Sequence, residues 1–103
     1  MLVKVMIKRK IKAGKAREVF ALLNKTRSAA MNQRGYITGE TLMNHDNPQE
    51  ILVISMWQDM ENWLNWKENP ERKANETIVE RWLEEPTAYE SYVFSTHHAQ
   101  FAK

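Results

Sequence analysis

The sequence predicts an α+β fold whose elements follow the order strand, helix, strand, strand, broken helix, strand. Three observations support this order. Apolar residues alternate with polar ones near the start of the chain, they recur at spacings of three and four in two longer segments, and turn-forming residues separate the segments. With 103 residues, 43% of them hydrophobic, the chain has the size and composition of one globular domain. We expect this domain to span residues 1–95, with a C-terminal tail at 96–103.

The first predicted strand covers residues 3–11, where valine and isoleucine side chains share one face and mostly lysines occupy the other. Gly14 ends this segment. Residues 15–31 then show the three, four and seven spacing of a helix with one apolar face. The residues on that face are Ala16, Val19, Phe20, Leu23, Ala30 and Met31. Gly35 follows as a C-terminal stop, so a single helix is predicted here.

The next two predicted strands form a hairpin. Residues 36–43, "YITGETLM", alternate in character, and residues 44–49, "NHDNPQ", are dense in turn formers. Residues 51–57, "ILVISMW", are apolar at nearly every position. Both faces of this third strand are therefore expected to be covered.

The second helical region is predicted in two pieces. Asp59 is a candidate N-cap for the first piece. Asn69 and Pro70 interrupt the region, because proline disfavours helical geometry in the preceding residue yet suits the first position of a new helix. Two inward rows are predicted on the second piece: Ala74, Ile78 and Trp82, and Asn75, Val79 and Leu83. Its glutamates, Glu76 among them, are expected on the solvated side. Residues 89–95 form the last strand.

This order is that of the ferredoxin-like βαββαβ fold, a four-stranded antiparallel sheet with helices on one face. The other face would still carry apolar residues, because the strand at 51–57 is hydrophobic on both sides. An exposed apolar patch of several hundred Å² is unusual for a small monomer. We therefore predict a homodimer in which two sheets pack face to face about a two-fold axis.

Several function classes are disfavoured by the sequence. The chain has no cysteine, which excludes disulfides, thiolate metal sites and a thiol nucleophile. It shows no phosphate loop, zinc motif or serine triad, and no apolar run approaches the roughly 18 residues of a membrane span. The N-terminus does not have the pattern of a signal peptide. We expect a cytoplasmic protein without a metal site or a membrane partner.

Nucleic-acid binding is a further alternative, because seven of the 15 Lys and Arg residues lie in the first 17 positions. RNA-recognition domains share the βαββαβ order, but they stack bases on aromatic residues of strands one and three. Here strand one has no aromatic residue, and Trp57 only ends strand three. No nucleic-acid partner is predicted.

The stretches "LVKVMIKRKIKAGKAREVFALL" and "GYITGETLMNHDNPQEILVISMWQDMENWLNWKENPERK" resemble the antibiotic biosynthesis monooxygenase family. The resemblance runs from about residue 3 to about residue 93. It implies a dimeric α/β barrel with a ligand cavity between helices and sheet in each protomer. Known members include cofactor-independent oxygenases of quinol-like aromatics and haem-degrading enzymes, and the activity of many is not established.

The resemblance can be carried to individual positions. The haem-degrading branch uses an asparagine, a tryptophan and a haem-binding histidine, and the matching positions here are Ile7, Trp66 and Glu76. Without the histidine, haem degradation is disfavoured. The quinone-forming branch has a tryptophan at Trp57, with an asparagine and a tyrosine where this chain has Val53 and Trp63. The sequence therefore assigns no catalytic residue.

We predict that the protein is a monooxygenase that needs no cofactor and oxidises a small aromatic or quinol-like substrate in an apolar pocket. Trp66, Trp63, Phe20 and Trp57 are the predicted pocket residues. The alternative for each tryptophan is ordinary core packing, since a small domain gains from burying large rings. At the level of function, the alternative is a non-catalytic dimeric protein that binds small ligands or is associated with stress.

Overall fold

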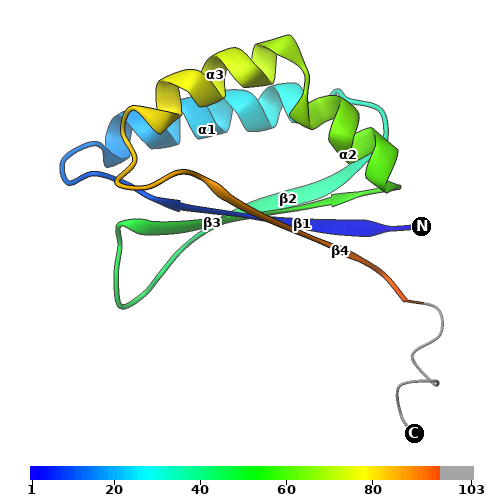
Figure 1. Cartoon of the computed structure of the whole chain (residues 1–103), viewed down its shortest axis with the longest axis horizontal. Helices are drawn as coiled ribbons and strands as arrows, with labels where there is room; N and C mark the ends of the chain where they lie inside the picture. Colours follow the sequence, from blue (N-terminus) through cyan, green and yellow to red (C-terminus); the bar gives the residue numbers. More distant parts are fainter. Residues whose placement is uncertain (96–103) are drawn as a thin grey trace, which may run out of the picture.

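A computed structural model describes residues 1–95 of the chain, and the predicted tail at 96–103 lies outside the described residues. The elements are β1 (Val3–Lys10), α1 (Ala16–Ala30), β2 (Tyr36–Met43), β3 (Glu50–Trp57), α2 (Met60–Lys67), α3 (Pro70–Glu80) and β4 (Ala88–Val93). All three helices lie on one side of the sheet (Figure 1). The predicted α+β ferredoxin-like fold is confirmed.

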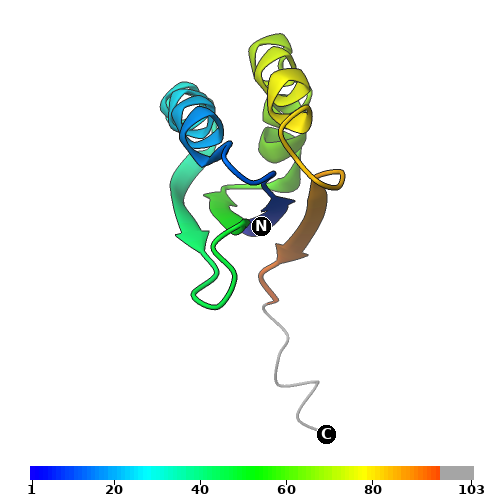
Figure 2. The same cartoon turned by 90° about the vertical axis from the view of Figure 1, so that its left-hand side faces the viewer.

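The strands form one antiparallel sheet in the order β2-β3-β1-β4. In the register of the sheet, Ile7 of β1 lies between Val53 of β3 and Tyr89 of β4. The pairing of β2 with β3 shifts between Tyr36 and Thr38. Figure 2 shows the curved sheet beneath the two rows of helices. The two central strands, β1 and β3, therefore carry the positions that the helices cover most completely.

The two-residue period of β1 divides its side chains between the faces. Val3, Val5, Ile7 and Arg9 are buried beneath the helices, whereas Lys8 is exposed on the opposite face. Two clusters make the core. The first comprises Val3, Val5, Ile7, Ala30, Trp57, Trp63 and Trp66, and the second Ile11, Val19, Leu23, Ile51, Val79 and Leu83. The first cluster contains all three tryptophans of the 57–66 segment.

Local signals explain where α2 begins and how it meets the preceding hairpin. Asp59 Oδ1 accepts a hydrogen bond of 2.9 Å from the backbone N–H of Asn62, as expected for an N-cap. Gly35 has a φ of +85°, and a Cβ atom there would lie 2.1 Å from Asn62 Nδ2. Only glycine suits both conditions. The turn before β2 and the first turn of α2 thus pack closely. Asn69 caps α3 in the same way, with Pro70 at its first position.

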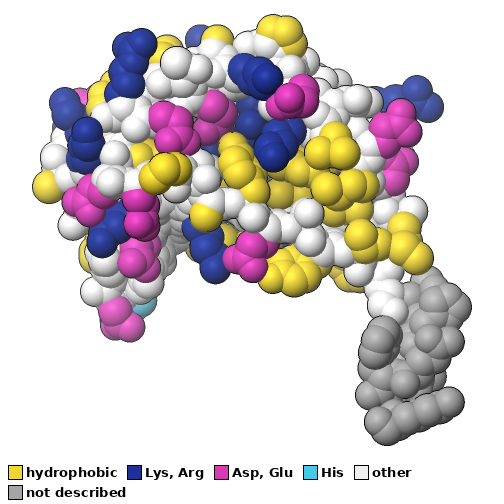
Figure 3. All heavy atoms as spheres, viewed as in Figure 1, with side chains coloured by type: hydrophobic (Ala, Val, Ile, Leu, Met, Phe, Trp, Pro, Cys, Tyr) yellow, Lys and Arg dark blue, Asp and Glu magenta, His cyan; other side chains and the backbone are white. Residues whose placement is uncertain are grey.

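The outer surface differs between the helix layer and the last strand. Figure 3 shows acidic and basic side chains spread over the helices, and hydrophobic side chains gathered lower down, toward β4. Tyr89, Tyr92, Val93 and Phe94 are the exposed large apolar residues of this strand region. Within residues 1–95, no helix combines the length and the hydropathy that a membrane span requires.

Replacing Asp59 with alanine removes the acceptor for the first turn of α2. The free energy of unfolding should fall by about 1 kcal/mol, measured by urea denaturation. Asp46→Ala is the matched control, because the Asp46 side chain is 93% exposed in the turn after β2. It should change stability by less than about 0.5 kcal/mol. Equal losses in the two variants would contradict the capping role.

Candidate functional site

A cavity of about 60 Å³ lies between the sheet and the helices. Side chains from β1, α1, β2, β3, α2 and α3 line it, so every described element except β4 contributes. Ile7, Val53 and Leu23 supply apolar surface. The fold therefore brings distant parts of the chain together around one cavity.

Two tryptophans form an aromatic wall of this cavity. Trp57 and Trp66 both line it and are almost fully buried. Trp57 Nε1 donates a 3.1 Å hydrogen bond to Ser55 Oγ, which satisfies the only polar atom of the indole. Tyr36 packs edge-on against Trp57, with 5.4 Å between ring centroids. Trp57 is therefore positioned by a hydrogen bond within β3 and by a ring contact from β2.

The other two predicted pocket residues lie elsewhere. Trp63 is buried behind Trp57, with 6.0 Å between ring centroids, and is outside the cavity lining. Phe20 is half-buried against the second core cluster and is also outside the lining. The structure thus brings Trp57 and Trp66 together at the cavity, places Trp63 in the layer behind them, and leaves Phe20 in the core.

A buried ion cluster forms another part of the cavity wall. Arg9 Nη2 donates to Glu76 Oε1 at 2.6 Å, and Arg72 Nη2 lies 3.5 Å from the same oxygen. The side chains are 2%, 13% and 4% exposed for Arg9, Glu76 and Arg72. The expectation that Glu76 lies on the solvated side of its helix is wrong. Glu76 lies on the inward face of α3, one helical turn after the buried Arg72, and its carboxylate is contacted by both Arg72 and Arg9.

Arg72 is held by contacts beyond the glutamate. Its Nη2 donates to the Tyr89 hydroxyl at 3.0 Å, and its Nη1 lies 3.4 Å from the carbonyl oxygen of Lys67. The guanidinium also stacks over the Trp63 ring, 5.3 Å from its centroid. Trp63 therefore reaches the cavity indirectly, by positioning a cation that lines it.

Three atoms of this cluster have no hydrogen-bond partner among the described residues. These atoms are Nε and Nη1 of Arg9 and Oε2 of Glu76. Each is buried, and both residues line the cavity. Since buried polar groups are normally paired, the cluster retains unused hydrogen-bonding capacity.

The residues present do not fit a haem group. Glu76 occupies the position of the family histidine, and its Oε1 is engaged by two arginines. His45 is almost fully exposed in the turn between β2 and β3, and His97 and His98 lie outside the described residues. Within residues 1–95 there is also no group of three or more His, Cys, Asp or Glu side chains suited to a metal ion.

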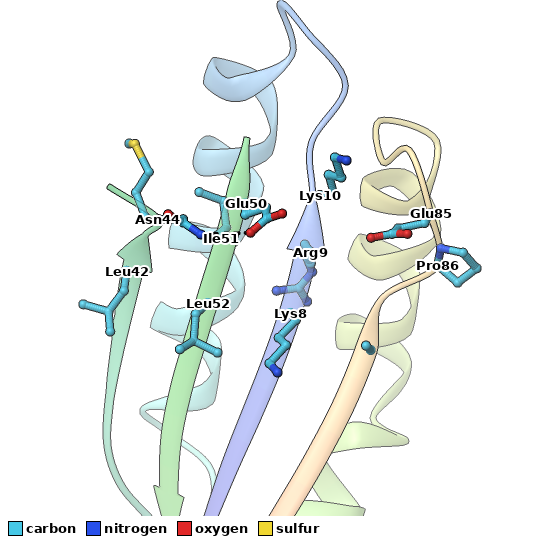
Figure 4. Close-up of a pocket in the computed structure, with 12 residues that line it drawn as sticks. Lys8, Arg9, Lys10, Leu42, Asn44, Glu50, Ile51, Leu52, Glu85 and Pro86 are labelled. Atoms are coloured by element: carbon cyan, nitrogen blue, oxygen red, sulfur yellow. Dashed lines mark hydrogen bonds between the residues drawn. The ribbon is translucent and has the colours of Figure 1, made fainter. Parts of the chain in front are cut away.

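A larger groove of about 700 Å³ lies at one end of the sheet, mainly on the face away from the helices (Figure 4). Lys8, Leu42 and Leu52 project from neighbouring strands on this side, and Glu85 and Pro86 lie at its edge. Tryptophan is absent from its lining, whereas two tryptophans enclose the smaller cavity. The smaller cavity beneath the helices, with its aromatic wall, is therefore the candidate functional site.

The family model for antibiotic biosynthesis monooxygenases matches residues 2–76, well over half of the chain. The chain belongs to the antibiotic biosynthesis monooxygenase family. The resemblance predicted from the sequence is thereby confirmed. A comparison with curated proteins finds no match.

Solved structures share the fold of this family member at low identity. A conserved protein from Methanosarcina mazei has a TM-score of 0.87 and 17% identity, covering 92% of this chain and 94% of its own. Rv0793 from Mycobacterium tuberculosis has a TM-score of 0.85 and 13% identity, covering 94% and 98%. SnoaB, a cofactor-independent oxygenase from Streptomyces nogalater, has a TM-score of 0.81 and 14% identity, covering 92% and 94%. At these identities the likeness shows the fold.

Arg9, Arg72 and Glu76 are the site residues that sequence reasoning missed. A signal for Arg9 was present, because it shares the inward phase of β1 with Val5 and Ile7. A charge at an inward strand position requires a buried partner. The partner itself, 67 residues away, has no local signature.

Glu76→Gln should lower the free energy of unfolding by about 3 kcal/mol, because Arg9 and Arg72 would lose their shared counter-charge in a buried setting. Chemical denaturation measures the change. Glu68→Gln makes the same chemical change on the surface, where Glu68 pairs with Lys73, and should cost less than about 1 kcal/mol. If both variants lose the same amount, the cluster does not stabilise the fold as described.

Proposed function

We propose that this family member is a monooxygenase that oxidises a small aromatic or quinol-like substrate without a cofactor. The observation that carries the proposal is the cavity under the helices with the buried Trp57 and Trp66 in its wall. Membership of the antibiotic biosynthesis monooxygenase family supports it. Flat apolar rings favour an aromatic substrate, and their burial keeps water from the reacting carbon.

The proposed reaction uses the substrate as its own source of electrons. A ring CH₂ group, in the keto tautomer of a phenol, loses a proton, and the resulting carbanion attacks O₂. One oxygen atom becomes the new carbonyl oxygen of the product, and the other leaves as water. The substrate loses four electrons and O₂ gains four, so no external reductant is needed. The residues in the wall serve to position the ring and exclude solvent.

Substrate binding requires the cavity to widen. A volume of about 60 Å³ has room for about two water molecules, whereas a cavity that binds benzene has about 150 Å³. On the α1 and β2 side of the cavity, Arg27 Nη2 donates to the Gly39 carbonyl oxygen at 2.5 Å, and both residues line the cavity. Arg27 is exposed, and β2 is an edge strand. We infer that separation of Arg27 from Gly39 opens the site.

We also propose that two copies of the chain pack through their helix-free sheet faces. In the register of the sheet, Met6 of β1 lies beside Ile54 of β3. Leu42 on the neighbouring strand is 44% exposed on the same face. Two charges on this face form a pair: Lys8 lies 2.9 Å from Glu90, and hydrogen bonds from Tyr92 and then Lys8 lower the pKa of the Glu90 carboxyl. A second sheet would cover the apolar centre of this face and leave Lys8 paired with Glu90.

Oxygen uptake in the presence of small quinols tests the proposed activity. Trp66→Phe should lower the rate about tenfold or more, because a smaller ring positions the substrate less well and admits water. Trp82→Phe is the matched control, since Trp82 packs against the second core cluster and does not line the cavity. Its rate should stay within about twofold of the unmodified protein.

An unmodified protein that binds quinols without consuming oxygen would favour the second candidate, a non-catalytic ligand carrier. One observation supports that candidate. Ile7 and Val53 line the cavity, and the resemblance to enzymes of the family places asparagines at these two positions. Equal rates in Trp66→Phe and Trp82→Phe would remove Trp66 from the proposed site.

Ile54→Asp tests the proposed dimer, because it places a charge at the centre of the helix-free face. Sedimentation velocity at micromolar concentration should show a dimer for the unmodified protein and a 12.2 kDa monomer for this variant. Lys25→Glu also changes charge, but on the exposed side of α1, and should leave the dimer intact. A monomeric unmodified protein would refute the proposed assembly.

A further inference from the structure

We propose that the cavity binds its aromatic ligand as an oxyanion, a phenolate or enolate, and that Arg9 is the residue that binds the negative oxygen. The proposal rests on the proposed function and narrows its substrate class. It follows from two features of the cavity, the unused hydrogen-bond donors on Arg9 and an excess of positive charge. It also follows from the proposed reaction, which requires an electron-rich ring.

The donors come from the side of Arg9 that Glu76 does not engage. A guanidinium carries five N–H groups, and those on Nε and Nη1 have no partner among the described residues. Arg9 is 4% exposed and lines the cavity, so bulk solvent has little access to these donors. An unpaired buried donor is costly, and a ligand oxygen in the cavity would relieve that cost.

The balance of charge favours an anion over a neutral ligand. The charged residues that line the cavity are Arg9, Arg27, Arg72, Glu40 and Glu76, and Glu40 shares the strand phase of the helix-free face with its neighbour Ile54. Arg27 and Glu40 are exposed, so solvent screens their charges. The buried members are two arginines and one glutamate, a formal excess of one positive charge. A ligand with one negative charge would neutralise this excess in a setting of low dielectric.

The same interaction explains how the ring becomes reactive. Binding a phenol or enol as its anion transfers the hydroxyl proton to solvent, and the remaining electron pair raises the electron density of the ring carbons. Arg9 stabilises the oxygen of this anion by a charge-assisted hydrogen bond. The neighbouring ring carbon then supplies the electrons for the bond to O₂. Arg9 would thus act by holding the reactive form of the substrate.

Glu76 offers the opposite arrangement, in which the ligand binds in its neutral form. Glu76 Oε2 is a buried acceptor without a partner among residues 1–95. A ligand that stayed neutral could donate a hydrogen bond from its hydroxyl group to this oxygen. The two arrangements differ in the ionisation state of the bound ligand, and an absorbing ligand reports that state directly.

The test uses the full chain and 4-nitrophenol, whose ionised form absorbs at longer wavelength than its neutral form. Titration of the bound dye should give a pKa at least about one unit below that of the free dye, equivalent to a tenfold preference for the anion. Its methyl ether, 4-nitroanisole, cannot ionise and should bind at least about tenfold more weakly at neutral pH. Neither measurement depends on a variant.

Variants then assign the effect to Arg9. Arg9→Met should abolish the pKa shift of the dye, and Arg9→Lys should retain part of it because the positive charge remains. Arg17→Met is the matched control, since Arg17 is exposed on α1 and outside the cavity lining, and it should leave the shift unchanged. An unchanged shift in a folded Arg9→Met protein would refute the role of Arg9.

Three results on the unmodified protein would overturn the inference: a bound dye that titrates like the free dye, equal binding of dye and methyl ether, or no binding of the dye. These outcomes are separate from the oxygen assay. If the protein lowers the dye pKa but consumes no oxygen with any quinol, the proposed activity is refuted and the oxyanion site is supported. If the protein oxidises quinols without lowering the dye pKa, only the oxyanion site is refuted.

Discussion

The ion pair between Arg9 and Glu76 is the interaction on which the arrangement of the helices over the sheet depends. Arg9 projects from the central strand β1 into a region that water hardly reaches. A charge in such a place is tolerated only with a partner, so α3 must turn its Glu76 face toward the sheet. That rotation also directs Arg72 inward, where Trp63 and Tyr89 receive it. The buried charge on β1 and the buried Asn75 and Val79 thus favour the same face of α3 toward the sheet.

The four tryptophans take different roles around this cluster. Trp57 and Trp66 face the cavity, while Trp63 lies behind them and stacks on Arg72. Trp82 belongs to the second core cluster. Pocket lining and core packing are therefore not exclusive alternatives for the tryptophans of this protein. A ring that lines a cavity is also buried on its other side, so the same tryptophan belongs to the pocket wall and to the core.

The fold was predictable because its signals are local. The period of β1, the Asp59 cap and the Asn69-Pro70 break each depend on residues within one turn or one strand. The site was predictable only in part. Trp57 and Trp66 follow from the resemblance to a known family, but the ion cluster joins residues from opposite ends of the domain. An acidic residue on a helix rich in glutamates is ordinarily solvated, and only the position of Arg9 explains why Glu76 is not.

The strand that carries Arg9 shows how one sheet can separate two functions. Lys8 and Arg9 are adjacent and carry the same charge, yet the two-residue period sends them to opposite faces. Lys8 pairs with Glu90 on the face proposed to meet a second copy, and Arg9 meets Glu76 beneath the helices. Because the backbone of the sheet lies between the two sets of side chains, a change on one face alters few contacts on the other. The proposed self-association and the proposed ligand chemistry can therefore vary independently, although both would use β1.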